Sequence, residues 1–126
     1  MRYRTNDIIV EQHGEVTLFD IQGDLTNSSE PILRSAFQKD NLQKHPRILL
    51  KLEKDAYINS GGIAVLIQLL AKTKQNNQVA GITGVSDHFM KIFKMVGITR
   101  FADIYDNVEN AIEVLSNAPC SKAASC

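Results

Sequence analysis

Two kinds of segment alternate along this chain, and that alternation constrains the fold more than any other feature of the sequence. Short runs of β-branched and apolar residues, typical of strands, alternate with longer segments whose apolar residues recur every three or four positions, typical of helices. The expected strands are 8–10, 16–21, 48–52, 79–83 and 104–105. The expected helices are 28 to about 44, 63 to about 74, 87–96 and 107–117. Because strands alternate with crossover helices, we predict an α/β fold: one domain with a mixed central β-sheet and about four α-helices.

Local signals mark the ends of several helices. Asn27 can cap the first helix, and Glu30 can return the second bond of a capping box. Asp106 and Glu109 form the same pattern before the last helix, and Gly97 is the expected stop of the third. Each helix should turn an apolar stripe toward the core. In the first and third helices the residues expected to be buried are Ile32, Leu33, Ala36, Phe37, Phe89, Ile92, Phe93 and Val96.

Charge and composition argue against several classes of partner. The 126 residues include 14 Lys and Arg against 14 Asp and Glu, so the formal net charge is zero. A protein that grips nucleic acid or anionic lipid needs a basic surface, so we expect no nucleic-acid partner. No stretch approaches the roughly 18 apolar residues of a membrane span, and the first residues are not followed by the hydrophobic region of a signal peptide. We therefore expect a cytoplasmic protein without membrane insertion.

Both cysteines lie near the end of the chain. Cys120 and Cys126 fall within the last seven residues, so they cannot cross-link the core. They show no metal-ligand spacing with the three histidines, and we expect no bound metal. Small residues dominate the sequence after Asn117. We therefore divide the chain into one domain, 1–117, and a disordered tail, 118–126.

The stretch Asn59-Ser60-Gly61-Gly62, which leads into the second helix, is the most informative part of the sequence. A serine at a helix start lies where unpaired N–H groups and the helix dipole favour negative charge, so a phosphoserine would be stabilised there. The two glycines allow another backbone to come close and leave the hydroxyl unscreened. The alternative is that Ser60 only caps its helix and the glycines only permit a turn. Taken alone, the residues leave both interpretations open.

The sequence offers little support for catalysis or nucleotide binding. The sequence contains neither G-x-x-x-x-G-K-[ST] nor G-x-G-x-x-G, so nucleotide binding is not expected. A serine nucleophile elbow reads G-x-S-x-G, but Ile58 occupies its first glycine position, and nothing brings His88 to Ser60 as a base. Asp24, after Gly23, is either a turn carboxylate or a neighbour of the Ser60 loop. We expect no catalytic residue, no cofactor and no enzymatic activity.

Three segments together resemble a known family. The residues from Tyr57 to Leu66 read Tyr-Ile-Asn-Ser-Gly-Gly-Ile-Ala-Val-Leu. This segment resembles the pattern aromatic-aliphatic-Asp-Ser-[Ser/Thr/Ala]-Gly-[Leu/Ile]-Gly-[Val/Thr]-Leu at the start of the second helix of the STAS domain. Gly23-Asp24-Leu25 is similar to the family's Gly-[Glu/Asp]-[Leu/Ile], and residues 95–101 are similar to its stretch before the last helix. The resemblance covers about residues 8–115 and is strongest to the small stand-alone bacterial anti-sigma-factor antagonists.

This resemblance implies a STAS-like single domain that acts in signalling. In the family, the serine after the Asp is phosphorylated by an anti-sigma factor that is also a serine kinase, and Ser60 matches that serine. The unphosphorylated antagonist binds the kinase and frees the sigma factor; phosphorylation releases the antagonist, and a PP2C-type phosphatase resets it. The resemblance therefore implies phosphorylation of Ser60 in a partner-switching pathway of transcription regulation. The residues expected to contact the partner are Asp24, Thr26, Asn59, Ser60, Gly61 and Gly62.

Two positions depart from the family pattern. Asn59 stands where an Asp precedes the acceptor serine, and Thr26 stands where an acidic residue is usual. The amide of Asn59 can form hydrogen bonds but lacks the charge. A second interpretation is therefore a non-switching STAS interaction subunit of a transporter or a stress-sensing complex. A third, a small enzyme with Ser60 as nucleophile, predicts labelling by serine-directed probes. The sequence leaves the oligomeric state open.

Overall fold

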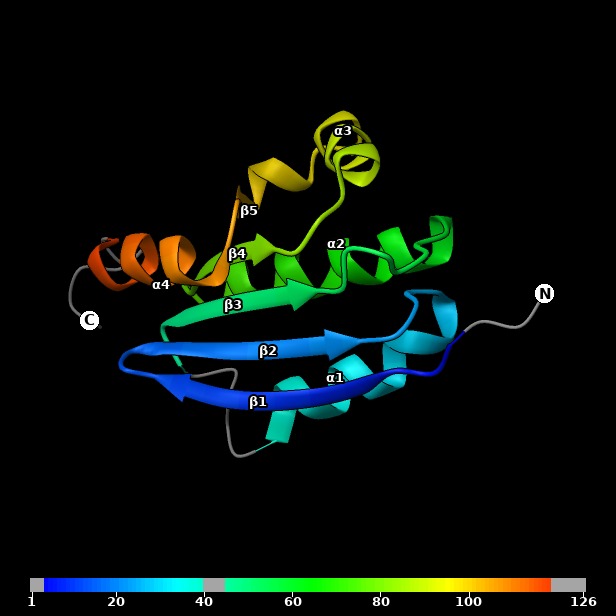
Figure 1. Cartoon of the computed structure of the whole chain (residues 1–126). Helices are drawn as coiled ribbons and strands as arrows, with labels where there is room; N and C mark the ends of the chain where they lie inside the picture. The colour runs from blue at the N-terminus through cyan, green and yellow to red at the C-terminus, as the bar shows by residue number, and fades with distance from the viewer. Residues whose placement is uncertain (1–3, 40–44, 119–126) are drawn as a thin grey trace.

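The computed structural model describes residues 4–39 and 45–118. In chain order the elements are β1 (Asp7–His13), β2 (Val16–Gln22), the 3-10 helix η1 (Asn27–Ser29), α1 (Glu30–Gln38), β3 (Arg47–Leu52), α2 (Ser60–Gln75), β4 (Val79–Thr83), α3 (Asp87–Val96), the 3-10 helix η3 (Ile98–Arg100), β5 (Ala102–Tyr105) and α4 (Val108–Asn117). The strands form one five-stranded sheet in the order β1-β2-β3-β4-β5 (Figure 1). The predicted α/β fold, with a mixed sheet and four α-helices, is confirmed.

The strand directions explain where the connections gather. β1 and β2 form an antiparallel hairpin that is closed between His13 and Val16, where Gly14 adopts a φ of 61°. The pairs β2·β3, β3·β4 and β4·β5 are all parallel. Parallel strands have their carboxyl ends at the same edge of a sheet, so the connections after β2, β3 and β4 meet at one edge. We call it the carboxyl edge.

Neighbouring strand residues point to opposite faces of the sheet and feed two hydrophobic clusters. Phe19 belongs to the larger cluster, to which α1, α2 and α3 contribute buried side chains. Its neighbour Leu18 belongs to the smaller cluster, which α4 covers through Ala111 and Leu115. In Figure 1, α4 lies in front of the sheet, and α1 and α2 lie behind it. The sheet is therefore the middle layer of a sandwich of helices.

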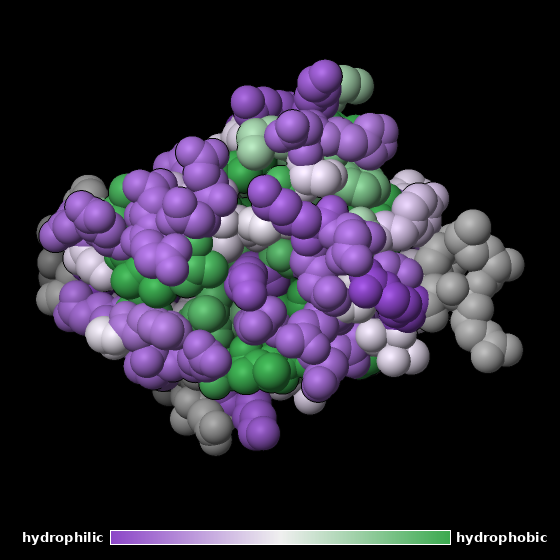
Figure 2. All heavy atoms as spheres, in the orientation of Figure 1, coloured by the Kyte–Doolittle hydropathy of each residue, from purple (hydrophilic) through white to green (hydrophobic). Residues whose placement is uncertain are grey.

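The face with α4 is only partly covered by that helix. Figure 2 shows hydrophilic side chains over most of this view, with hydrophobic ones gathered beside α4 and along the lower margin, where β1 runs in Figure 1. Ile9 of β1 and Val114 of α4 are 44% and 43% exposed. Lys51 and Asp20, on neighbouring strands, form an ion pair at 3.7 Å. This face thus combines a small apolar cluster with a polar surface.

The start of the first helix differs from the expected capping box. The 3-10 helix η1 precedes α1, and its cap is Thr26 rather than Asn27. The hydroxyl of Thr26 accepts a hydrogen bond from the Ser28 N–H at 3.1 Å. In return, the hydroxyl of Ser29, and not the carboxylate of Glu30, accepts from the Thr26 N–H at 3.1 Å. The extra 3-10 turn therefore places the capping box one residue earlier.

The cap of the last helix lies one residue later than expected, at Asn107 instead of Asp106. Asn107 is extended, with a φ of −154°, and its Oδ1 accepts a hydrogen bond from the Asn110 N–H at 2.7 Å. The capping box expected from Asp106 and Glu109 is therefore wrong, because a closer amide side chain occupies the cap position. The expected stop of the third helix is confirmed, since Gly97 adopts a φ of 87° after α3.

The first helix is shorter than expected, and two buried stripes are narrower. Lys39 has an extended ψ of 137°, which ends α1 there, and residues 40–44 lie outside the described residues. Ile32 and Val96, both expected in the core, are each 40% exposed. They flank the stripes of α1 and α3, whose buried members include Leu33 and Phe93. Helical spacing predicted which side of each helix faces the core but overestimated the width of the buried stripe.

Other expectations concern the end of the chain, metals and membranes. Cys120, Cys126 and the rest of 119–126 lie outside the described residues. Within residues 4–39 and 45–118, no three His, Cys, Asp or Glu side chains are grouped so that they could hold a metal ion. None of the helices in that same part of the chain has the length and apolar character needed to cross a membrane.

Candidate functional site

Ser60 is the first residue of α2 and is exposed. The helix is capped by the preceding residue, because the Oδ1 of Asn59 accepts a hydrogen bond from the Gly62 N–H at 2.9 Å. The interpretation in which Ser60 caps α2 is therefore wrong. In the first turn of α2, which is fully described, there is no acidic side chain. The positive end of the helix dipole is thus free of a neighbouring carboxylate on its own turn.

The start of α2 packs closely against the connection that follows β2. Leu25 and Ile58 form a parallel bridge, in which the Leu25 N–H donates to the Tyr57 carbonyl at 2.9 Å. A Cβ at Gly62 would lie 2.1 Å from the Leu25 carbonyl oxygen, and a Cβ at Gly61 would lie 2.9 Å from the backbone nitrogen of Asn27. Both positions therefore need glycine so that the two backbones can meet. The predicted close approach at the two glycines is confirmed.

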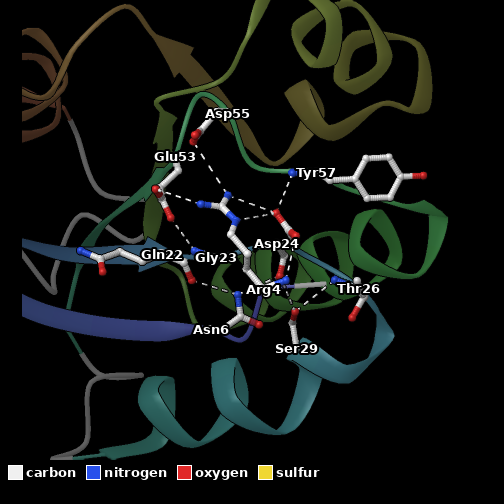
Figure 3. Close-up of polar contacts among 10 residues, drawn as sticks. All are labelled: Arg4, Asn6, Gln22, Gly23, Asp24, Thr26, Ser29, Glu53, Asp55 and Tyr57. Atoms are coloured by element: carbon white, nitrogen blue, oxygen red, sulfur yellow. Dashed lines mark hydrogen bonds and ion pairs between the residues drawn. The ribbon is translucent and has the colours of Figure 1, made fainter. Parts of the chain in front are cut away.

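Asp24 lies beside the loop that leads to Ser60 (Figure 3). Its side chain is 10% exposed. The carboxylate accepts hydrogen bonds from the Arg4 N–H at 2.9 Å, from the Arg4 Nη2 at 3.1 Å and from the Tyr57 N–H at 2.9 Å. Of the two interpretations of Asp24, the structure therefore supports a place next to the Ser60 loop. There the carboxylate ties that loop to the end of β2.

The environment of Asp24 holds it in the charged form. Burial, the largest single effect, raises the pKa of Asp24 because it penalises the charge. Hydrogen bonds from the Arg4 and Tyr57 N–H groups, together with the bond and the charge of the Arg4 guanidinium, lower that pKa and outweigh burial. The pKa of Asp24 therefore lies below its usual value. The bond to Asp24 is likewise the main reason why the pKa of Arg4 is raised.

Arg4 faces two further carboxylates. Its Nη1 lies 3.6 Å from the Oε2 of Glu53, and its Nη2 lies 3.8 Å from the Oδ1 of Asp55. Glu53 in turn accepts a hydrogen bond from the Gly23 N–H at 2.6 Å. One guanidinium thus connects the segment before β1, the end of β2 and the loop after β3 (Figure 3).

Thr26 has a structural role that its position in the sequence did not indicate. It is 6% exposed, and its hydroxyl is engaged in the cap of η1. The hydroxyl of Ser29, which completes that cap, also donates to the Asp24 carbonyl at 3.3 Å. Thr26 therefore shapes the turn that packs against the start of α2.

The six residues singled out in the sequence lie at the carboxyl edge. Asp24 and Thr26 belong to the connection after β2, Asn59 is the last residue before α2, and residues 60–62 begin α2. Two residues of this site were not found by sequence reasoning. Arg4 was missed because its contact with Asp24 spans 20 positions and leaves no local pattern. Tyr57, whose side chain is exposed, was quoted only as the aromatic residue of a motif; its backbone contact with Asp24 has no sequence signature.

The carboxyl edge combines a rigid support with an accessible hydroxyl. The support consists of Asp24, Arg4 and the Leu25–Ile58 bridge. Above it, Ser60 is exposed at the amino end of a helix of 16 residues. Backbone N–H groups at such an end favour negative charge, so a phosphate on Ser60 is compatible with the folded protein.

Comparisons with solved structures support the same architecture. A putative anti-sigma factor antagonist from Thermotoga maritima matches with a TM-score of 0.72 and 15% identity, over 87% of this chain and 95% of that one. An anti-sigma factor antagonist from Mycobacterium paratuberculosis matches with a TM-score of 0.75 and 16% identity, over 90% and 96%. A STAS domain protein from Planctomyces limnophilus matches with a TM-score of 0.66 and 17% identity, over 87% and 98%. At these identities, the likeness concerns the fold.

Sequence comparison identifies the family. No curated protein matches the chain. The family model described as STAS domain, however, matches residues 7–111, which include all five strands and the first turn of α2. This match covers most of the 126 residues and agrees with the resemblance found in the segment around Ser60. The chain therefore belongs to the STAS domain family.

Proposed function

We propose that this protein is an anti-sigma-factor antagonist that is switched by phosphorylation of Ser60. In this proposal it binds an anti-sigma factor that is also a serine kinase, through the turn at Asp24 and Thr26 and through residues 59–62. Phosphorylation ends the complex, and a PP2C-type phosphatase restores the hydroxyl. The protein acts in the cytoplasm as a binding partner and not as an enzyme.

The observation that carries this proposal is the placement of Ser60. It is the exposed first residue of α2, its neighbour Asn59 supplies the cap, and the two glycines that follow it are packed against the connection after β2. The hydroxyl is therefore not needed to cap the helix and is accessible to a kinase. Two similar structures are those of a putative anti-sigma factor antagonist from Thermotoga maritima and an anti-sigma factor antagonist from Mycobacterium paratuberculosis, which supports a partner of that class.

A phosphate on Ser60 would weaken a complex more than the fold. Phosphoserine adds about −1.5 to −2 charge at pH 7. In the free protein the helix end and water stabilise that charge. In an interface the same charge loses its water and meets the partner's surface, which costs binding free energy. This difference between the free and the bound protein is what makes the modification a switch.

A second candidate function, a STAS subunit that binds constitutively, is favoured by one observation. Asn59 replaces the family's Asp, and its Oδ1 is occupied by the Gly62 N–H at 2.9 Å. A neutral amide cannot supply the charge that a carboxylate would place beside the serine. In this alternative the same edge binds a transporter subunit or another STAS protein, and Ser60 is never modified.

The experiment that separates the two functions compares the proteins recovered from native lysate by four baits. These are the wild type, Ser60→Ala, Ser60→Glu and the control Ser35→Glu, which places the same charge on an exposed serine of α1. We expect an anti-sigma factor with an ATPase fold to bind the wild type, Ser60→Ala and Ser35→Glu but not Ser60→Glu. The recovered factor, supplied with ATP, should add a phosphate at Ser60, located by mass spectrometry. Equal binding of all four baits without phosphorylation would instead support the constitutive subunit.

A further inference from the structure

The residues before β1 are part of the candidate site although the family match does not include them. That match begins at residue 7, whereas Arg4 and Asn6 form hydrogen bonds with the connection after β2. We call residues 4–6 the strap. We propose that the strap is a positioning element: it fixes Asp24 and, through Asp24, the loop that presents Tyr57 and Ser60 to a partner. Only the presentation to a partner rests on the function proposed above.

The path of the strap is set by backbone contacts. The Asp24 N–H donates to the Arg4 carbonyl at 3.2 Å. The Nδ2 of Asn6 donates to the Gln22 carbonyl at 3.1 Å and to the Asp24 carbonyl at 2.9 Å. Gly23 has a φ of 93°, and a Cβ there would lie 2.2 Å from the Thr5 carbonyl oxygen. The strap can therefore pass this close to the connection after β2 only because residue 23 is a glycine.

The guanidinium of Arg4 orients the carboxylate that holds the loop. The Oδ1 of Asp24 accepts from the Arg4 Nη2 at 3.1 Å and from the Tyr57 N–H at 2.9 Å, so one oxygen joins the strap to the loop (Figure 3). Without the guanidinium, the Asp24 carboxylate would keep only its two backbone donors, the N–H groups of Arg4 and Tyr57. The carboxylate would then lose its charged partner and would be held less firmly against the loop.

Further hydrogen bonds connect Tyr57 to the start of α2. The Tyr57 carbonyl accepts from the Leu25 N–H at 2.9 Å, and the Asn59 N–H donates to the Leu25 carbonyl at 3.1 Å. Asn59 then caps the helix that begins with Ser60. A short series of hydrogen bonds thus leads from the strap to the residue that precedes Ser60. A looser Tyr57 backbone would let the exposed Tyr57 ring and the helix start vary in position.

The test measures hydrogen exchange of single backbone amides by NMR in the wild type and in strap variants. Arg4→Gln removes the charge, Arg4→Lys keeps it without the forked donor, and Asn6→Ala removes the second anchor. The matched control is Arg34→Gln, which removes an exposed arginine that pairs with Glu30 on α1 at 2.9 Å. We expect the protection of the Tyr57 amide to fall about tenfold in Arg4→Gln, the size expected for a weakened bond to a charged acceptor. Arg4→Lys should recover part of it.

The outcomes separate positioning from general loosening. Protection of core amides such as Leu50 should fall less than that of the Tyr57 amide in Arg4→Gln, and the Tyr57 amide should be unchanged in Arg34→Gln. If Tyr57 keeps its protection in Arg4→Gln, or loses it equally in Arg34→Gln, the positioning role is overturned. This result needs no partner, so it decides the strap's role even if the proposed function fails.

A second measurement tests the presentation to a partner. It compares the dissociation constants of the wild type, Arg4→Gln and Ser60→Ala for the anti-sigma factor recovered with the wild-type bait. We expect weaker binding by Arg4→Gln and nearly unchanged binding by Ser60→Ala. Wild-type affinity of Arg4→Gln, with a Tyr57 amide that has lost protection, would overturn the presentation step. If the wild-type bait recovers no anti-sigma factor, the proposed function is what fails, and the presentation step fails with it.

Discussion

Asp24, in the connection after β2, and Ser60, the first residue of α2, lie at the same edge of the sheet, but their polar groups have opposite surroundings. Asp24 is 8% exposed, and its carboxylate accepts hydrogen bonds from the strap and from the loop before α2. Ser60 is exposed, and the cap of its helix is supplied by Asn59. A buried group with its partners satisfied supports the fold, whereas an exposed group is available for binding and modification. Stability and signalling should therefore be separable by mutations at these two residues.

The largest effect is expected where the start of α2 touches the connection after β2. Gly62→Ala places a Cβ 2.1 Å from the Leu25 carbonyl oxygen, so the Leu25–Ile58 bridge must open. We expect a loss of about 4 kcal/mol in the free energy of unfolding, measured by urea denaturation. Gly14→Ala is the control: its Cβ meets nothing within 4 Å, and only its φ of 61° is unfavourable, which costs about 1 kcal/mol. Equal losses in both variants would contradict the tight contact at Gly62.

The next effect concerns the charge of Asp24. Asp24→Asn keeps the shape but loses the charged acceptor of four hydrogen bonds from Arg4 and Tyr57. We expect a loss of about 2 kcal/mol in unfolding free energy at neutral pH, measured by urea denaturation.

The same variant should change how stability depends on pH. Because the pKa of Asp24 is lowered in the folded protein, its contribution is fully present above the unfolded-state pKa of about 3.9. It is lost as the pH falls through the lower folded-state value. Urea titrations of the wild type and Asp24→Asn between about pH 2 and 6 should therefore converge at the acidic end. Parallel curves over that whole range would show that the Asp24 charge does not stabilise the fold.

A smaller effect on stability is expected at Asn59, which caps α2. Asn59→Ala removes the acceptor of the Gly62 N–H and should cost about 1 kcal/mol of unfolding free energy. Asn107→Ala removes the corresponding cap of α4 and should cost a similar amount. Only Asn59→Ala should also slow phosphorylation of Ser60 by the anti-sigma factor, since only that cap adjoins the hydroxyl. An equal change in the rate of phosphorylation in both variants would point to general destabilisation.

The smallest effect on stability is expected at Ser60 itself. Because its side chain is exposed and does not cap α2, Ser60→Ala should change the unfolding free energy by less than about 0.5 kcal/mol. The same variant should abolish the phosphate that mass spectrometry detects. A large loss of stability in Ser60→Ala would show that the Ser60 hydroxyl, like Asp24, is needed for the fold.

The fold could be predicted because its main signals are local. The alternation of strand and helix segments follows from residues a few positions apart, and all five strands and four helices were anticipated. The errors arose where two neighbouring residues could serve the same purpose. Thr26 and Asn107 took caps assigned to Asn27 and Asp106, because a cap depends on the backbone angle that each residue adopts.

The candidate site could be predicted only in part. Two short motifs carry the six predicted residues, and their contact with a partner stays a prediction. The glycines of the second motif indicated the close contact with Leu25, which the structure confirms. Arg4 could not be found, because nothing near it in the sequence reveals a carboxylate 20 positions away. Whether the hydroxyl of Ser60 or the amide of Asn59 caps α2 was likewise decided by backbone geometry.

The positions of the first and last described residues have a practical consequence for handling this protein. Arg4 lies against Asp24 at the carboxyl edge, whereas the Ala118 carbonyl is bound by Arg47 at the beginning of β3, on the opposite edge. An affinity tag or fluorescent fusion at the amino terminus would therefore crowd the surface on which a partner is expected. A tag joined directly after Ala118, the last described residue, would start from the far side. Assays of complex formation should use carboxyl-terminal fusions, and an amino-terminal fusion provides a steric competitor for the same surface.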